Sequence, residues 1–342
     1  MSFRWGIIGC GGIAPKFFQS MEACAAQGGK TGEGHVVAAA SKSMRRAKRF
    51  RQETGVAKIY GSYEQMLDRE KLDAVYIATS HNFHFENARL CLNRGLPVLV
   101  EKAFTRNAAE AEELIALARA KNLFCMEAMW TRFNPAIVKF RELMRNGVIG
   151  DAERVQAAFC IRMRPLSLKM APWNRMCSPK LAGGALLDLG VYAVSLARMV
   201  FAQSPTRMGG SAKMAWTGVD HTSEYHLDFG HGQRADLVSS FHESRTCEAV
   251  ITGSRGIIRI PGFSHPSRLI VSRPGRAVEN LDIEPDRIQN GSPGFQHEIR
   301  EVHRCLNEGL AESETMPLDE TLDVMRTMDT LRGLWGMKYP GE

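Results

Sequence analysis

The sequence lacks the cysteine spacing and the long apolar runs that mark several specialised protein classes. Its eight cysteines are scattered and never adopt a C-x-x-C spacing. This pattern suits a reducing cytoplasm and argues against a disulfide framework and a zinc site, so we expect no metal. No apolar run approaches the length of a membrane span, and the N-terminus enters a strand directly, without a visible secretory signal. The sequence therefore predicts a cytoplasmic protein with no membrane partner.

The chain also lacks a concentrated tail of lysine and arginine. Its formal charge is +7, with 44 basic against 37 acidic residues. Nucleic acid and an anionic cofactor or substrate explain such an excess equally well. Neither a P-loop nor the G-x-S-x-G pattern of a nucleophile elbow is present. We expect a small-molecule ligand and no nucleic acid.

The length of 342 residues favours two domains over one. Strand and helix patterns alternate through the first part of the chain, which predicts a parallel sheet with right-handed crossovers. We therefore expect an α/β Rossmann domain, a doubly wound parallel sheet, over residues 1–126. Its expected strands are 3–8, 35–40, 57–60, 74–78, 98–100 and 124–126; its expected helices are 13–23, 44–53, 63–69, 108–120 and one that ends at Asn93.

The pattern changes after about residue 127. Several short β-like runs between residues 207 and 282 are broken by Gly, Pro and His, which fits an antiparallel meander. We expect an α+β domain with a largely antiparallel, open-faced sheet over residues 127–342, serving substrate binding and dimerisation. Its other expected elements are a strand at 153–163 and helices at 135–146, 184–201, 294–307 and 318–335.

A glycine-rich segment joins the first expected strand to the first expected helix. It has the G-x-G-x-x-A form, in which Gly9 permits a tight turn and Gly11 lets a pyrophosphate approach the backbone. Ala14 lets the helix pack closely on the strand, and the helix N-terminus attracts the anion. The strand before and the helix after favour a dinucleotide site over a chance glycine turn. The expected cofactor-binding residues here are Gly9, Gly11, Gly12, Ile13 and Ala14.

The second expected strand does not end in a carboxylate, which would bind a free ribose 2′-hydroxyl. It runs instead into Ser41 and Lys42, with Arg46 soon after, while Glu33 precedes the strand in a glycine-rich insertion at 25–34. A hydroxyl and two cations suit a 2′-phosphate, so the sequence favours NADP, with NAD the less favoured cofactor. The alternative is that these cations only cover a solvated helix face.

Polar residues follow the expected strand at 74–78. Thr79, Asn82 and His84, with backbone donors of the same segment, are candidates to contact the nicotinamide ribose. Loop histidines such as His81 and His84 are otherwise more often structural. The sequence leaves both interpretations open.

Glu101 and Lys102 follow the apolar run at 98–100. Ligands of open parallel sheets bind outside the carboxyl ends of the strands, where a lysine can meet a cofactor and a substrate together. The alternative is a solvated charge pair.

Asp188 and Tyr192 stand four residues apart on an expected helix that is otherwise apolar, which places them on one face. They form either a buried hydrogen bond or a proton-transfer pair, because hydride transfer to a carbonyl requires a proton donor. A nearby ammonium, such as that of Lys102, favours a phenolate and lowers a tyrosine pKa. The sequence leaves both alternatives open.

Two aromatic residues and an arginine follow the last strand of the first expected domain. Trp130 and Phe133 are candidates for an apolar wall of a substrate pocket, although aromatic residues at this spacing are more often core. Arg132 is a candidate substrate-binding or ion-pair residue.

Together these segments resemble the oxidoreductase family typified by glucose–fructose oxidoreductase and inositol dehydrogenase. Within it, the chain is most similar to the branch of dimeric dihydrodiol dehydrogenases and NADP-dependent D-xylose dehydrogenases. The resemblance covers nearly the whole chain. Its segments are WGIIGCGGIA, VEKAFTRNAAEAEELIALA, EAMWTRFNP, GGALLDLGVY, TGSRGIIRI, GFQHEIREV and GMKYPGE.

The resemblance implies roles for individual residues. Lys102 matches the lysine of the E-K-P motif, which contacts nicotinamide and the reacting hydroxyl, and Glu101 becomes its ion-pair or ribose-side neighbour. Asp188 matches the active-site aspartate, and Tyr192 matches the acid/base position. Trp130 matches a substrate-pocket tryptophan.

The family also implies homodimers formed through the open sheet of the second domain. The chain departs from the family pattern in two features, one substitution and one insertion. Ala103 stands where the family has a proline that would restrict the backbone, and the insertion at 25–34 is additional.

The expected activity is NADP-dependent hydride transfer between nicotinamide C4 and a secondary-alcohol or hemiacetal carbon of a diol or sugar. Tyr192 would take the hydroxyl proton, Lys102 would polarise the oxygen, and Asp188 would orient the pair. The alternatives are an anhydro-sugar or keto-sugar reductase of the same family and a non-catalytic NADP sensor.

Overall fold

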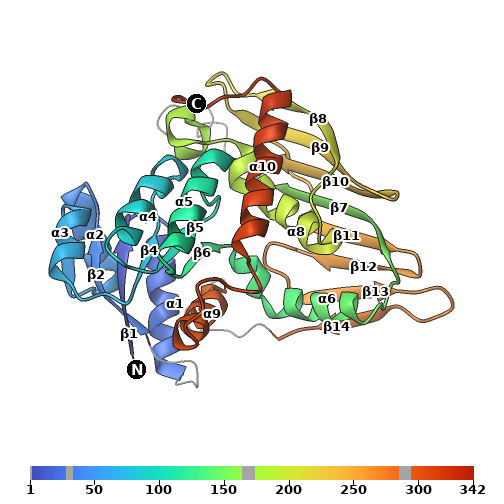
Figure 1. Cartoon of the computed structure of the whole chain (residues 1–342). Helices are drawn as coiled ribbons and strands as arrows, with labels where there is room; N and C mark the ends of the chain where they lie inside the picture. Colours follow the sequence, from blue (N-terminus) through green and yellow to red (C-terminus); the bar gives the residue numbers. More distant parts are fainter. Residues whose placement is uncertain (1, 28–33, 164–173, 285–293) are drawn as a thin grey trace. The chain divides into compact units, whose positions relative to one another are not determined.

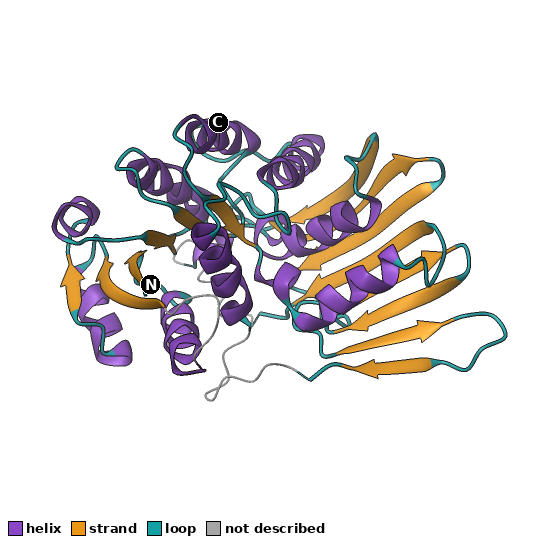
Figure 2. Ribbon diagram, turned by 60° about the horizontal axis from the view of Figure 1, so that its bottom comes forward, coloured by secondary structure: helices purple, strands orange, loops and turns teal. Residues whose placement is uncertain are grey.

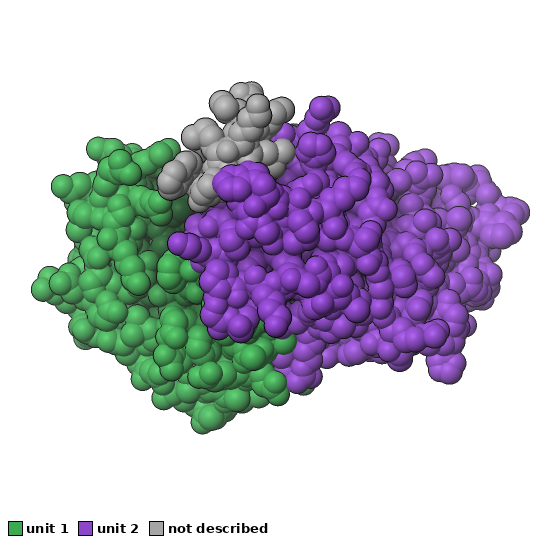
Figure 3. Space-filling view, turned by 90° about the horizontal axis from the view of Figure 1, so that it is seen from above, with its two compact units in different colours: residues 1–133, 286–321 green, residues 134–285, 322–342 purple. Residues whose placement is uncertain are grey.

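The computed structural model describes residues 2–27, 34–163, 174–284 and 294–342. The chain divides into two compact units, coloured in Figure 3. The first contains residues 1–133 and 286–321, and the second contains residues 134–285 and 322–342. These units differ from the two continuous domains, 1–126 and 127–342, that we expected, because a late segment returns to the first unit. Most of the insertion at 25–34, including Glu33, lies outside the described residues.

A six-stranded sheet forms the centre of the first unit (Figure 1). Its strand order is β3-β2-β1-β4-β5-β6, and every neighbouring pair is parallel. All residues of β4 and β5 are buried, as expected for strands covered on both faces. This confirms the predicted doubly wound sheet. The strands are β1 (Phe3–Ile8), β2 (Gly34–Ala40), β3 (Lys58–Tyr60), β4 (Ala74–Ile77), β5 (Val98–Glu101) and β6 (Cys125–Ala128).

Helices connect these strands, and side-chain caps fix where several of them begin. The Ser43 side chain accepts the N–H of Arg46 at the start of α2, and the Asn107 side chain accepts the N–H of Glu110 at the start of α5. The helices are α1 (Ala14–Gln27), α2 (Met44–Thr54), α3 (Tyr63–Arg69), α4 (His84–Leu92) and α5 (Ala108–Ala120), with short 3-10 turns at His81–Phe83 and Trp130–Phe133.

Helix α9 (Phe295–Asn307) belongs to the first unit because it packs against α1. Its His303 accepts a hydrogen bond at 2.9 Å from the indole nitrogen of Trp5 in β1, and the ring of Phe3 stacks on it. A Cβ at Gly34 would lie 2.5 Å from the same imidazole, so glycine leaves room for the ring. These contacts explain why residues far along the chain return to the first sheet.

The second unit contains an eight-stranded sheet in the order β14-β13-β12-β11-β7-β10-β9-β8. All its neighbouring pairs are antiparallel except β7 and β10, which confirms the largely antiparallel sheet. The strands are β7 (Ala152–Cys160), β8 (Arg207–Met214), β9 (Asp220–Gly230), β10 (Gln233–Ser240), β11 (Glu248–Gly253), β12 (Gly256–Pro261), β13 (Arg268–Ser272) and β14 (Glu279–Asp282).

The position of β7 corrects the expected meander. Residues 207–282 do not form an unbroken antiparallel series, because β7 lies between β10 and β11. Its alternate residues Val155, Ala157 and Phe159 are buried, so they fill the covered face of the sheet between the two later strands.

Helices α6 (Pro135–Arg145) and α8 (Val191–Phe201) lie on the same face of this sheet (Figures 1 and 2). Helix α8 contacts β7 and β10, and α6 contacts β13. Along β10, Leu237 is buried whereas its neighbour Val238, on the opposite face, is partly exposed. Among the described residues of the second unit, no helix covers that opposite face (Figure 2). The last helix, α10 (Leu318–Leu334), begins in the first unit and continues in the second.

One helical stretch corrects the expectation that no apolar run reaches membrane-spanning length. The helical stretch Pro179–Phe201 is long and apolar enough to cross a membrane, with a mean hydropathy of 1.5 over its most apolar part. However, 83% of that apolar part is buried inside the structure, which is typical of the core helix of a globular unit. Its apolar composition is explained by packing against β7 and β10.

Candidate active site

The carboxyl ends of β1, β4, β5 and β6 lie side by side, because these strands are parallel neighbours. The residues that follow them therefore share one edge of the first sheet, where ligands of such sheets bind. This edge carries Gly9 after β1, Thr79 after β4 and Lys102 after β5.

Glycine is required at position 9. Its φ is +100°, and its N–H donates to the carbonyl of Ala40 at 2.9 Å. A Cβ there would lie 2.7 Å from the carbonyl group of Ala78. A Cβ at Gly12 would meet no atom within 4 Å, so the segment is open just before α1 begins at Ala14. This tight turn, with space beside a helix N-terminus, fits the pyrophosphate of a dinucleotide.

The predicted cofactor residues after β2 form a compact turn at the start of α2. Ser41 is buried, and its hydroxyl accepts the N–H of Ser43 at 3.3 Å. Lys42 and Arg46 are exposed, and the ammonium of Lys42 lies over the ring of Phe83 at 5.4 Å from its centroid. Two exposed cations beside a hydroxyl-bearing turn fit a phosphate ester.

The three residues that we predicted to contact the cofactor after β4 differ in their exposure to solvent. Thr79 and Asn82 are partly exposed at the sheet edge. His84 is fully buried; its Nδ1 lies 2.9 Å from the carbonyl oxygen of Ala103, and its Nε2 lies 3.1 Å from that of Thr79. These contacts fit the structural alternative for His84, and its contact to the nicotinamide ribose stays a prediction.

Glu101 and Lys102 have different surroundings, which distinguishes this pair from a solvated one. Glu101 is buried and accepts a hydrogen bond from the hydroxyl of Tyr76 in β4. Lys102 is partly exposed, and the peptide bond between it and Ala103 is cis. Glu101 thus belongs to the interior of the sheet, and Lys102 is the member of the pair that a ligand at the edge would meet.

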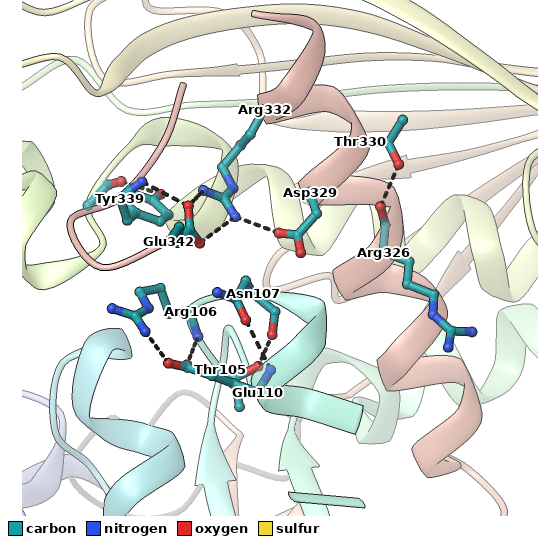
Figure 4. Close-up of polar contacts among 11 residues, drawn as sticks. Thr105, Arg106, Asn107, Glu110, Arg326, Asp329, Thr330, Arg332, Tyr339 and Glu342 are labelled. Carbon is teal, nitrogen blue, oxygen red and sulfur yellow. Dashed lines mark hydrogen bonds and ion pairs between the residues drawn. The ribbon is translucent and has the colours of Figure 1, made fainter. Parts of the chain in front are cut away.

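The segment after Lys102 is held by its own polar groups, as Figure 4 shows. Thr105 donates its hydroxyl to the carbonyl of Asn107 at 2.7 Å. The N–H of Arg106 donates to the carboxylate of Glu110 at 3.1 Å, and the Arg106 guanidinium pairs with the same carboxylate. These contacts join the segment to the first turn of α5.

Trp130, Arg132 and Phe133 are all buried in the 3-10 turn that follows β6. The ring of Trp130 lies 6.0 Å from that of Phe295 in α9. Arg132 forms a 2.5 Å ion pair with Glu320, which fits the ion-pair alternative, and its role in substrate binding stays a prediction. Its charge is neutralised within the first unit.

In the second unit, Asp188 and Tyr192 are both buried, but they do not belong to one regular α-helix. Residues Leu186–Gly190 form a π-helical turn, in which the N–H of Val191 donates to the carbonyl of Leu186, and α8 begins only at Val191. The ring of Tyr192 lies 5.4 Å from that of Phe159 in β7. The π-helical turn therefore changes the expected placement of Asp188 and Tyr192 on one face of a regular helix. Such π-helical turns are frequent at functional sites.

Asp188 has a cationic partner that sequence reasoning missed. One guanidinium nitrogen of Arg175 lies 3.1 Å and 3.2 Å from its two carboxylate oxygens. The Asp188 side chain is 5% exposed, whereas that of Arg175 is 42% exposed. A buried carboxylate is thus compensated by a cation that remains accessible to solvent.

The loop that carries Arg175 is fixed to the two glycines before the π-helical turn. The N–H of Gly184 donates to the carbonyl of Met176 at 2.8 Å. A Cβ at Gly183 would lie 2.6 Å from the carbonyl oxygens of Arg175 and Met176. Only glycine permits this approach, which brings Arg175 to Asp188. No local sequence pattern indicates the pair, because residues 175 and 188 come together through this loop.

Two further contacts anchor the segment that carries Asp188. Buried Asp220 accepts the N–H of Leu186 at 2.8 Å, so it caps the start of the π-helical turn. The hydroxyl of Tyr339 donates to the carbonyl of Gly183 at 2.6 Å. Arg332 lies over the Tyr339 ring and binds Glu342, a cluster shown in Figure 4. The C-terminal segment therefore supports the Asp188 turn.

Comparisons with known proteins agree with this arrangement. Residues 3–129 match the model of an oxidoreductase family with an NAD-binding Rossmann fold, and residues 137–259 match that of the GFO/IDH/MocA C-terminal domain. The chain is 33% identical to trans-1,2-dihydrobenzene-1,2-diol dehydrogenase of Mus musculus, over 99% of both chains. It is 36% identical to D-xylose 1-dehydrogenase (NADP(+)) of Hypocrea jecorina, over 99% of this chain and 93% of that protein.

Solved structures share the fold at lower identity. A 3-ketoreductase from Actinomadura kijaniata, in complex with NADP and TDP-benzene, has a TM-score of 0.81 at 24% identity, over 97% of this chain and 98% of that one. An aldose–aldose oxidoreductase from Caulobacter crescentus, complexed with glycerol, has a TM-score of 0.82 at 19% identity, over 98% and 97%.

Proposed function

Because this chain belongs to the GFO/IDH/MocA family of oxidoreductases, we propose that it transfers a hydride between NADP and a secondary-alcohol or hemiacetal carbon of a diol or sugar. The observation that carries the proposal is the shared edge of the first sheet. There the Gly9 turn and Lys102 follow neighbouring parallel strands. One position is suited to a pyrophosphate and the other to the reacting end of the same cofactor.

The proposal assigns NADP to the edge beside β2. Lys42 and Arg46 would bind the 2′-phosphate, and the backbone at Gly11 and Gly12 would bind the pyrophosphate. Thr79 and Asn82 remain proposed contacts to the nicotinamide ribose. When bound, NADP supplies the acceptor or donor of the hydride.

The proposal gives the proton chemistry to three residues. In the oxidative direction Tyr192, as the phenolate, takes the hydroxyl proton of the substrate and becomes the phenol, and Lys102 stabilises the negative charge that develops on the substrate oxygen. Asp188, whose negative charge is balanced by the Arg175 guanidinium, orients Tyr192 for the proton transfer. Trp130 and Phe133 remain proposed apolar neighbours of the substrate, close to the edge that carries Lys102.

The experiment begins with cofactor binding. NADPH should raise the melting temperature more than NADH does at equal concentration, because binding to the folded state stabilises it by mass action. A screen of sugars, diols and the corresponding carbonyl compounds then identifies a substrate by the change in NADPH absorbance.

Two variants test the assignment of residues. With a verified substrate, Tyr192→Phe and Lys102→Met should each lower kcat by on the order of 100-fold or more. Normal turnover in both variants would refute the roles. Binding of NADPH without turnover of any carbonyl compound would favour a non-catalytic sensor.

We also propose that the protein forms homodimers through the outward face of the eight-stranded sheet, in a reducing cytoplasm. In support, Ala158, Val238 and Val250 line a shallow depression at the centre of that face, beside the Arg259–Glu248 ion pair. Val238→Asp should convert a dimer, measured by light scattering, into a monomer. All eight cysteines are free, which is consistent with the proposed compartment.

A further inference from the structure

The peptide group between Ala103 and Phe104, directly after Lys102, is held on both sides by buried ionisable side chains. Its N–H, on Phe104, donates to a carboxylate oxygen of Glu127 at 3.1 Å. Its carbonyl oxygen, on Ala103, lies 2.9 Å from Nδ1 of His84. Both polar atoms of one peptide group are therefore occupied by side chains.

The two side chains come from opposite sides of β5. Glu127 belongs to β6, where it is the register partner of Val100, and His84 begins α4, after β4. Both are fully buried, and so are Ala103 and Phe104. The backbone after Lys102 is thus fixed between β6 on one side and the start of α4 on the other.

Glu127 has no exposed surface through which it could meet a ligand. Its second carboxylate oxygen accepts the hydroxyl of Thr321 in α10 at 3.2 Å. Both oxygens therefore receive hydrogen bonds from within the first unit. A fully buried glutamate is costly unless it is paired or performs a task, and these two bonds connect it to the Lys102 turn.

We propose that Glu127 is a positioning residue for Lys102: with His84 it clamps the Ala103–Phe104 peptide group and so fixes the direction in which the Lys102 side chain leaves β5. The inference rests on the proposed function, because it concerns the lysine assigned to the reacting end of the cofactor. It also accounts for a departure from the family. Alanine at position 103 lacks the ring that would restrict the backbone, and the clamp supplies a restraint at the next peptide group.

The charges around Glu127 give the clamp a pH dependence. Burial raises the pKa of the Glu127 carboxyl to about 7. The hydrogen bonds from Thr321 and Phe104 act in the opposite direction and lower this pKa, as do the positive charges of Arg132 and Lys102. Arg132 is itself paired with Glu320, and His84 lies on the other side of the clamped peptide. Deprotonation of Glu127 near neutral pH strengthens its bond to the Phe104 N–H and adds a negative charge within reach of Lys102.

Two variants separate the parts of the clamp. Glu127→Gln keeps an oxygen that accepts the Phe104 N–H but removes the titration. We expect near-normal kcat with the loss of one ionisation near neutral pH from the kcat profile. Glu127→Leu removes the acceptor, so kcat should fall about 10-fold or more with little change in the KM for NADPH. The matched control is Glu298→Gln, the same substitution at another fully buried glutamate of the first unit, which should leave kcat and its pH profile unchanged.

A measurement that needs no substrate complements the kinetics. Hydrogen–deuterium exchange of the Phe104 amide should accelerate at least 10-fold in Glu127→Leu and remain slow in Glu298→Gln. The double variant Lys102→Met/Glu127→Leu should turn over no more slowly than Lys102→Met alone, because Glu127 acts through the lysine.

The outcomes distinguish this inference from the proposed function. If Lys102→Met is inactive while Glu127→Leu keeps the kcat, the pH profile and the Phe104 exchange rate of the unmodified protein, the clamp is wrong and the proposed function stands. If Lys102→Met retains normal turnover, the proposed role of the lysine fails, and slow exchange that depends on Glu127 would then report only a structural restraint.

Discussion

A guanidinium nitrogen of Arg175 lies within 3.2 Å of both carboxylate oxygens of Asp188. The pair joins a partly exposed cation to a buried carboxylate at the turn that precedes Tyr192. Hydrogen bonds between two charged groups stabilise the charged form of both partners. Arg175 should therefore hold the Asp188 carboxylate in one orientation.

The first prediction concerns this pair. Arg175→Met should lower kcat about 10-fold, because it removes a charge-assisted hydrogen bond. Arg175→Lys should recover part of the lost activity. Lys180→Met, an exposed cation in the next 3-10 turn, is the control and should leave kcat unchanged. A normal kcat in Arg175→Met would show that Asp188 does not depend on the pair.

The second prediction concerns the turn after β1. Gly9→Ala should abolish the stabilisation by NADPH in a thermal-shift assay, because the new methyl would displace the Ala78–Thr79 backbone. The strained φ adds a cost of about 1–3 kcal/mol in stability. Gly55→Ala is the matched control: its φ is +77°, but a Cβ there meets nothing within 4 Å. It should lower the melting temperature and leave the NADPH-induced shift intact.

The third prediction tests the choice of cofactor. Arg46→Ala should raise the KM for NADPH about 10-fold, by removing a charged hydrogen bond to the 2′-phosphate, and should leave the KM for NADH unchanged. Arg49→Ala, one helical turn further along α2 and paired with Glu53, serves as the comparison. Equal effects of Arg46→Ala on both cofactors would contradict the assignment of the 2′-phosphate to this turn.

The fourth prediction concerns Glu298 in α9, which is fully buried and whose carboxylate oxygens have no hydrogen-bond partner among the described residues. Burial, and then the charge of Glu101, raises the pKa of the Glu298 carboxyl well above its usual range. The folded state therefore holds this proton more tightly than the unfolded state does. Its contribution to stability is intact below the unfolded value of about 4.3 and is lost as the pH rises toward the raised folded value.

Glu298→Gln should therefore raise the melting temperature at pH 8 and leave it nearly unchanged at pH 4. Melting curves across this range for both proteins provide the test. A variant whose melting temperature keeps the same slope with pH would show that another group produces the dependence.

The fold was largely predictable because local patterns dictate it. Apolar runs such as Val98–Glu101, alternating with helical segments, indicate a parallel sheet, and glycine at positions 9 and 11 indicates a dinucleotide site. Caps such as Ser43 mark helix starts from neighbouring residues alone. These features depend on residues close in the chain, which is why sequence periodicity shows them.

The surroundings of the site were less predictable because they depend on distant residues. The sequence indicated Asp188 but not Arg175, and it indicated Lys102 but gave Glu127 no role. The sequence left Arg132 open between substrate binding and an ion pair, and it gave no sign that Glu320 is the ion-pair partner. The π-helical turn at Leu186–Gly190 follows from packing and from the Asp220 cap, which is 34 residues away from Leu186 in the sequence. Long-range pairings of this kind leave no local periodicity.

The division of the chain between the two units has a consequence for synthesis. The first sheet is complete by residue 128, but α9, which packs on α1, comes almost 170 residues later, and the Tyr339 that supports Gly183 comes later still. A chain emerging from the ribosome therefore completes the strands of its first sheet well before it has made the helix that covers α1. Nascent chains stopped before α9 should thus expose the apolar surface of α1 that α9 covers and require chaperones.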